Sequence, residues 1–158
     1  MNDRYQIIGP LYDFLATIFS FGQIDKCKCG MHDRIRPDMR VLFAGVGQGI
    51  DAMEAASLGA QVTVVDLSQT MLTVFRKRIQ GRYFIHPIRI VHSDIFKFEE
   101  YDQYDMVYAN FFLNVFPSDV VLRLEEHLTK LARPGGHVVV GDFSLPTGGV
   151  WARLIQHI

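Results

Sequence analysis

Short apolar runs rich in β-branched residues alternate with longer amphipathic stretches along most of this chain, and that alternation restricts the fold more than any other feature. Short bounded runs predict strands, whereas apolar residues spaced three or four apart predict helices. Strands joined by helical crossovers lie parallel in one sheet, with helices on both faces. We therefore expect an α/β fold with a Rossmann-like, open, mostly parallel sheet. The expected strands are residues 41–44, 61–65, 88–92, 104–109 and 137–143.

Capping residues set the expected helix boundaries. Residues 50–58 should form the first helix of the sheet region. Ser68 should cap a second helix that runs to about residue 80, because a serine hydroxyl can accept a hydrogen bond from a free amide of the first turn. Ser118 should cap a third helix, which should end at the stretch ARPGG, residues 132–136.

The 158 residues are expected to form one domain with an N-terminal helical extension. Helices over residues 11–22 and 24–35 should precede the first strand and form a lid, within residues 1–36, over a core of residues 37–143. Residues 144–158 would begin a C-terminal part whose further strands are missing from the sequence. The fifth strand would then be an open edge on which a second copy could pack, so a homodimer is one expectation.

Charge and hydropathy argue against several classes of partner. The formal net charge is -1, so no bulk attraction draws the chain to nucleic acid or to an anionic membrane. No apolar run reaches the roughly 18 residues of a transmembrane helix, and the N-terminus lacks a secretory pattern, so we expect a cytoplasmic chain with a small-molecule partner. Cys27 and Cys29 predict reduced thiols and no metal site, because His32 is the only further ligand nearby and a zinc site needs four.

The residues that could carry chemistry follow the expected strands. In an open α/β sheet, ligands bind outside the carboxyl ends of the strands. Three glycines, Gly45, Gly47 and Gly49, follow the first strand and open a helix, where backbone amides can approach a ligand closely. Asp66 ends the second strand, where its carboxylate could accept hydrogen bonds from both hydroxyls of a ribose. Asp94 ends the third strand and could accept from an exocyclic amine. Each aspartate could instead serve only its own turn.

Five stretches in order resemble, in sequence and spacing, the successive motifs of class I S-adenosylmethionine-dependent methyltransferases: VLFAGVGQG, VTVVDLSQTML, HSDIFKF, YDMVYANFFLNVF and LARPGGHVVVGDF. The resemblance covers roughly residues 41–143 and implies S-adenosyl-L-methionine as cofactor and S-adenosyl-L-homocysteine as product. It also implies the site residues: Gly45, Gly47 and Gly49 under the methionine part, Asp66 at the ribose, Leu67 and Met71 beside the adenine, Asp94 at the adenine amine with Ile95 packed beside the ring, and Asn110 near the methyl group.

The flanking stretches LYDFLATIFSFGQIDKCK and GDFSLPTGGVWARLI are similar to those of the ubiquinone and menaquinone C-methyltransferases. This similarity implies a small acceptor, apolar or aromatic and quinone-like. Methyl transfer is an in-line displacement, so most of the catalysis can come from holding the two reactants together. Tyr12, Asn110 and Asn114 are the candidates for orienting the acceptor or the cofactor's carboxylate, and His86 and His92 are candidate bases.

Phe43 departs from the family, which usually has Asp or Glu at this position to help hold the cofactor's ammonium group. Asp51 is the nearest replacement, although an acid in a first helical turn also suits the helix dipole. Phe43 keeps a second hypothesis open: a cofactor-binding domain without methyltransferase activity, in a regulatory or assembly role. A nicotinamide-dependent oxidoreductase would have the same fold, but its fingerprint needs a glycine where this chain has Ile50.

Overall fold

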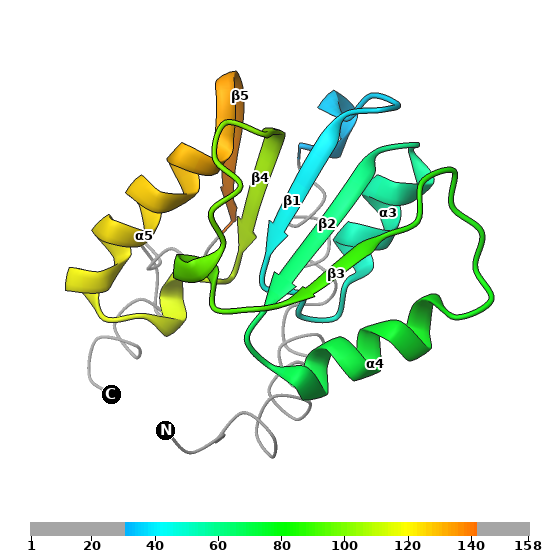
Figure 1. Cartoon of the computed structure of the whole chain (residues 1–158), viewed down its shortest axis with the longest axis horizontal. Coiled ribbons are helices and arrows are strands. Elements are labelled where there is room, and N and C mark those ends of the chain that lie inside the picture. Colours follow the sequence, from blue (N-terminus) through cyan, green and yellow to red (C-terminus); the bar gives the residue numbers. More distant parts are fainter. Residues whose placement is uncertain (1–30, 142–158) are drawn as a thin grey trace, which may run out of the picture.

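The computed structural model describes residues 31–141, apart from the side chain of Asn114. Five strands form one sheet in the order β3-β2-β1-β4-β5, and every pair of neighbours is parallel. The predicted open parallel sheet is therefore confirmed (Figure 1). The strands are β1 Arg40–Ala44, β2 Gln61–Asp66, β3 Arg89–His92, β4 Tyr104–Asn110 and β5 Ala132–Gly141; the helices are α3 Ile50–Ser57, α4 Gln69–Ile79 and α5 Ser118–Leu131, with short 3-10 turns η1 His32–Arg34, η2 Ile95–Lys97 and η3 Leu113–Val115.

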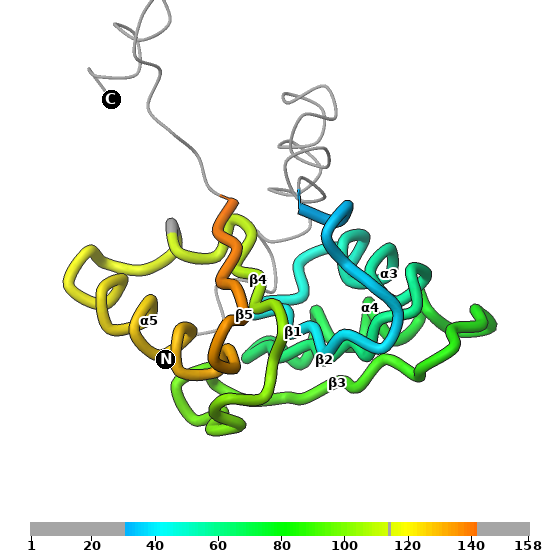
Figure 2. The backbone as a smooth tube through the Cα atoms, turned by 90° about the horizontal axis from the view of Figure 1, so that it is seen from above, coloured from blue at the N-terminus to red at the C-terminus, as the bar shows by residue number. Residues whose placement is uncertain are grey.

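Helices cover both faces of the sheet, because successive residues of each buried strand point to opposite sides. On one face, α3 and α4 pack over Val41, Phe43, Val64 and Tyr108. On the other face, α5 packs over a second apolar cluster that includes Val107. Figure 2 shows α5 on one side of the strands and α3 and α4 on the other. Burial on both faces explains why the strands are continuous apolar runs.

Phe43 belongs to the core of the α3 and α4 face. The residue is 2% exposed, and its ring stacks on the ring of Tyr108 with 4.9 Å between centroids and 11° between planes. Phe43 lies opposite Val64 on β2 and Tyr108 on β4 in the register of the sheet. The aromatic side chain therefore contributes packing near the carboxyl end of the central strand.

The helix starts agree with the sequence at α4 and disagree at α5. The Ser68 side chain accepts a hydrogen bond from the amide of Met71 at 3.3 Å, so the predicted cap of α4 is confirmed. The prediction that Ser118 caps α5 is wrong. Pro117 occupies the N-cap position with extended backbone angles and no side-chain cap, and Ser118 is the first helical residue. The fixed φ of proline positions this helix start without a hydroxyl acceptor.

The fifth strand begins earlier than expected. Residues 132–136 were predicted to end a helix, but they form the first half of β5. A register shift against β4 between Tyr104 and Met106 accommodates this stretch. A Cβ added at Gly136 would lie 2.8 Å from the carbonyl oxygen of Tyr104, so the glycine lets the two backbones approach closely.

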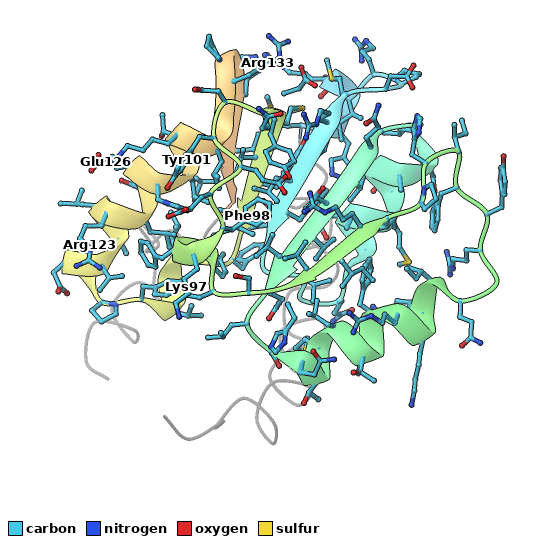
Figure 3. The ribbon with its side chains drawn as sticks, in the orientation of Figure 1. Lys97, Phe98, Tyr101, Arg123, Glu126 and Arg133 are labelled. Atoms are coloured by element: carbon cyan, nitrogen blue, oxygen red, sulfur yellow. The ribbon has the colours of Figure 1, made fainter. Side chains whose placement is uncertain are left out.

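The segment between β3 and β4 fills the space beside α5. The rings of Tyr101 and His127 pack edge to face, with 5.9 Å between their centroids. His127 Nε2 lies 3.1 Å from the carbonyl oxygen of Phe98. Figure 3 shows Phe98 and Tyr101 on the sheet side of α5, with Arg123 and Glu126 on its outer side. The predicted helix 24–35 falls mostly outside the described residues, and its described end is the 3-10 turn η1. The predicted helix 11–22 also lies outside them.

Candidate ligand-binding site at the carboxyl ends of the strands

The glycine loop between β1 and α3 has a conformation that only glycine can adopt without strain. Gly45, Gly47 and Gly49 have φ angles of 80°, 47° and 70°. A Cβ at Gly49 would lie 2.2 Å from a ring carbon of Phe75, and one at Gly45 would lie 2.8 Å from a ring carbon of Phe112. Both glycines are therefore required by backbone angle and by packing. Because the loop carries no side chains at these positions, its backbone forms a cradle that can approach a ligand closely.

Asp66 joins this loop to the end of β2. Its Oδ2 accepts a hydrogen bond from the amide of Val46 at 2.7 Å, and its Oδ1 accepts from the amide of Ser68 at 2.7 Å. Burial raises the pKa of Asp66, while the bonds from Val46 and Ser68 and the nearby His92 oppose that rise. An ionised carboxylate has about four lone-pair sites, so the two amides leave acceptor capacity for further donors such as hydroxyls.

The ends of β2 and β3 provide the next group of predicted residues. Asp94 Oδ1 accepts from the amide of Phe96 at 3.0 Å and caps η2, which buries Ile95. Leu67 is 61% exposed, and Met71 is partly buried against the α3 and α4 core. The structure therefore brings Asp66, Leu67 and Asp94 to the same edge of the sheet as the glycine loop, in the region that Figure 1 shows at the arrowheads of β1 and β2.

Asn110 ends β4 and contacts the start of α3. Its Nδ2 donates a hydrogen bond to Oδ2 of Asp51 at 3.1 Å, which connects the carboxyl end of β4 to the helix that follows the glycine loop. Asp51 is 6% exposed. The first-turn position predicted for Asp51 is confirmed, but its burial and its bond to Asn110 could not be inferred from spacing along the chain.

One contact to the loop was not anticipated from the sequence. Arg78 of α4 donates a hydrogen bond to the carbonyl of Gln48, within the glycine loop. Arg78 lies in a row of basic residues at the end of α4, a pattern that normally indicates only a favourable helix C-terminus. The sequence contains no signal that separates Arg78 from its neighbours, because the contact depends on how α4 lies beside the glycine loop in the folded chain.

The candidate bases lie at different ends of the sheet. His92 is the last residue of β3, at the carboxyl edge of the sheet, with Nε2 3.0 Å from the carbonyl oxygen of Leu67. His86, the other candidate base, precedes β3, and its Nε2 lies 2.7 Å from Asp38 Oδ1 at the opposite edge of the sheet, so the structure does not bring it to the glycine loop. Asn114 lies in η3, shortly after β4, and Tyr12 falls outside the described residues.

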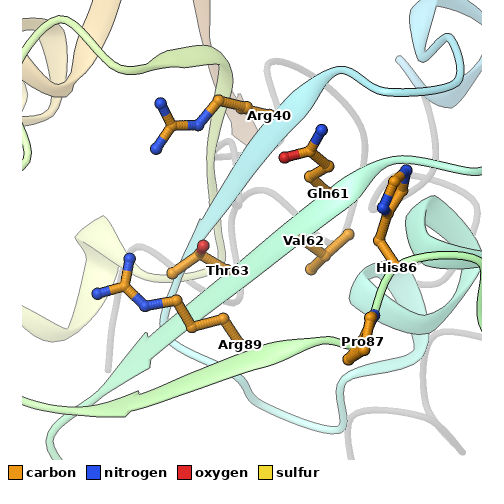
Figure 4. Close-up of a pocket in the computed structure, with 7 residues that line it drawn as sticks. All are labelled: Arg40, Gln61, Val62, Thr63, His86, Pro87 and Arg89. Atoms are coloured by element: carbon orange, nitrogen blue, oxygen red, sulfur yellow. The ribbon is translucent and has the colours of Figure 1, made fainter.

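A hollow of about 300 Å³ also lies on that opposite half of the sheet (Figure 4). The first residues of β1, β2 and β3 line it, together with four neighbours, and these residues are Arg40, Gln61, Val62, Thr63, His86, Pro87 and Arg89. Arg89 is paired with Glu100 at 2.6 Å. The hollow therefore does not include the glycine loop or the acids at the carboxyl ends.

Metal ligands do not gather in the described part of the chain. Residues 31–141 contain no group of three His, Cys, Asp or Glu side chains that could hold an ion. His32 is buried, with Nδ1 3.3 Å from Glu54 Oε2 and its ring edge on the ring of Tyr108. Cys27 and Cys29 lie outside the described residues. None of the helices in residues 31–141 is long and apolar enough to cross a membrane.

Comparison with known families matches this arrangement. A family profile described as a methyltransferase domain matches residues 41–136, which run from β1 to the middle of β5. The chain belongs to this family. The resemblance to class I S-adenosylmethionine-dependent methyltransferases is thereby confirmed, and the glycine loop, Asp66 and Asp94 all lie within the matched residues of the methyltransferase domain.

The relatives of this chain are named after different methyl acceptors. The chain is 31% identical over 156 residues to a demethylmenaquinone methyltransferase of Mycobacterium sp. (strain KMS), an alignment of 96% of this chain and 63% of that protein. It is 30% identical over 132 residues to a ribosomal protein L11 methyltransferase of Desulfitobacterium hafniense, covering 83% of this chain and 40% of the relative. This chain thus spans less than two thirds of the length of either relative.

A solved structure shares the same fold. A magnesium protoporphyrin IX methyltransferase from Synechocystis PCC 6803, determined with bound SAM, is 25% identical and superposes with a TM-score of 0.61. The superposition covers 70% of this chain and 53% of that protein.

Proposed function

We propose that this methyltransferase domain transfers the methyl group of S-adenosylmethionine to a small apolar or aromatic, quinone-like acceptor. The observation that carries the proposal is the 2.7 Å hydrogen bond from the amide of Val46 to Asp66, which fixes a glycine cradle beside a carboxylate at the carboxyl edge of the sheet. The left-handed backbone at Gly45, Gly47 and Gly49 leaves the loop without side chains at these positions, which suits a ligand that lies close to the backbone.

The residues at this edge match the chemical groups of S-adenosylmethionine. Backbone amides of residues 45–49 and the start of α3 would meet the methionine carboxylate. The remaining lone pairs of Asp66 would accept from the ribose hydroxyls. The adenine would lie between the side chains of Leu67 and Met71, with Asp94 toward its amine and Ile95 beside the ring. The bound cofactor supplies a methyl group on a sulfonium, which is already activated for transfer.

The chain's own contribution to the transfer is positioning. An in-line displacement needs the acceptor atom and the methyl carbon aligned at close distance, and it does not need a covalent intermediate on the protein. Asn110 lies at the end of β4, where its amide is held by Asp51 and can orient a reactant. Tyr12 and Asn114 remain proposed partners in this role. If the acceptor must lose a proton, His92 is the histidine proposed to accept it.

The quinone-like acceptor draws support from the name of the mycobacterial relative, and the ribosomal protein methyltransferase among the relatives gives the main competing acceptor class. Incubation of the full chain with S-adenosylmethionine carrying a labelled methyl group and a cell extract separates the two. The proposal predicts label in the lipid fraction. Label only in protein would contradict the quinone-like acceptor, and no label despite cofactor binding would favour a binding domain without activity.

A further inference from the structure

Asp51 is a buried carboxylate that lacks a cationic partner among the described residues. Its Oδ1 accepts from the amide of Ala52 at 3.0 Å, and its Oδ2 accepts from Asn110 at 3.1 Å. No Lys, Arg or His of residues 31–141 forms an ion pair with it. Removing a carboxylate from water costs several kcal/mol unless a positive charge and hydrogen bonds compensate, and within residues 31–141 only amide donors do so. The arrangement is therefore complementary to a bound cation.

Asp51 lies where open α/β sheets bind their ligands. The strand order reverses between β1 and β4, because the chain runs from β1 outward to β3 and then returns to β4 and β5. Ligands of open α/β sheets occupy the crevice at this reversal. The hydrogen bond between Asn110 and Asp51 spans it, from the end of β4 to the first turn of α3. The last residues of β1, Phe43 and Ala44, are apolar and buried, so that strand places no acid there.

The proposed orientation of the cofactor brings a cation to this crevice. Asp66 lies at the end of β2, on one side of the glycine loop, and would hold the ribose. The methionine part would then extend across the loop toward the reversal between β1 and β4. It ends in a carboxylate, which amide donors can bind, and in a protonated amine, which they cannot bind because both are donors.

We propose that Asp51, oriented by the side chain of Asn110, binds the ammonium group of S-adenosylmethionine. This assignment rests on the proposed function, because it requires that cofactor in the site. It makes Asp51 a selectivity residue: it should contribute to the affinity for ligands that carry the amino-acid part and contribute nothing for a nucleoside that lacks it.

Calorimetric titration with two ligands tests the assignment. S-adenosylhomocysteine carries the amino-acid part, and 5′-methylthioadenosine keeps the adenosine and sulfur but lacks the amine and carboxylate. In Asp51→Asn, we expect the affinity for S-adenosylhomocysteine to fall about tenfold or more and that for methylthioadenosine to change by less than about twofold. Asp119→Asn, which changes an exposed first-turn acid of α5, should leave both affinities unchanged.

Several outcomes would overturn the assignment. Equal losses for both ligands in Asp51→Asn would mean that Asp51 only supports the loop, and an unchanged affinity for S-adenosylhomocysteine would exclude contact with the ammonium. If Asp51→Asn does not fold, Asp51→Glu keeps the charge and should keep the preference for S-adenosylhomocysteine over methylthioadenosine; loss of that preference would contradict the assignment. Failure of the unchanged chain to bind either ligand would instead contradict the proposed function itself, and the assignment with it.

Discussion

At position 43, a phenylalanine ring stacks on Tyr108 and is almost fully buried in the central strand. Phe43→Asp should therefore destabilise the fold by at least about 3 to 5 kcal/mol, since it loses a large buried side chain and places a charge in the core. Denaturant unfolding measures the loss, and Phe43→Leu should lose much less because it keeps an apolar group. A Phe43→Asp variant that is as stable as the parent and binds S-adenosylhomocysteine more tightly would show that position 43 faces the ligand.

A comparison of two glycines with similar backbone angles separates the cost of left-handed backbone strain from the cost of a steric clash. Gly49 and Gly81 have φ angles of 70° and 76°, but a Cβ would meet Phe75 at Gly49 and nothing within 4 Å at Gly81. Gly81→Ala should cost only the left-handed strain, about 1 to 2 kcal/mol. Gly49→Ala should cost clearly more and weaken S-adenosylhomocysteine binding. Equal unfolding free energies for the two variants would refute the close contact with Phe75.

Asp66 gives the proposed binding a defined pH dependence. Burial raises the pKa of this carboxyl above its ordinary value of 3.8, so it takes up a proton at a higher pH than an exposed aspartate. The carboxylate is the form that accepts from two hydroxyls. Affinity for S-adenosylhomocysteine should therefore be full near neutral pH and fall as the pH drops through that raised pKa, and the folded state should gain stability relative to the unfolded chain over the same range. Asp66→Asn should remove this dependence, which titrations between about pH 4 and about pH 7 would detect.

At the scale of elements, the starts of α4 and α5 allow a matched comparison, because a serine lies at each of them. Ser68 caps α4 through its hydroxyl, whereas Ser118 follows Pro117 and caps nothing. Ser68→Ala should cost about 1 kcal/mol of unfolding free energy. Ser118→Ala should stay within about 0.5 kcal/mol, as expected for an exposed position without a specific contact. A larger loss at Ser118 would contradict the described start of α5.

The strands and helices were largely predictable, because burial on both faces produces continuous apolar runs and a serine cap marks the start of α4. The start of β5 was not, since Pro134 and the glycines after it usually terminate an element. Pairing with β4 through a register shift overrides that local tendency. Such pairing joins residues far apart in the sequence, so local patterns cannot reveal it.

At the scale of the whole molecule, one topological rule explains which of the predicted site residues the structure brings together and which it keeps apart. Asp66 ends β2 and Asp94 comes shortly after β3, so both lie at the carboxyl edge beside the glycine loop. His86 precedes its strand, so the same rule places it at the other edge, where it pairs with Asp38. The contacts of Asp51 and Arg78 depend on helix packing and needed the structure.

The binding of an S-adenosyl ligand at Asp66 is the property of the chain on which the proposed site depends. Calorimetric titration of S-adenosylhomocysteine into the full chain and into Asp66→Ala measures it directly, with Asp119→Asn as the control. We expect one site per chain and a loss of affinity of about tenfold or more in Asp66→Ala, with no change in the control. Equal affinities in Asp66→Ala and the unchanged chain, with both proteins folded, would contradict the placement of the cofactor at the carboxyl edge of this sheet.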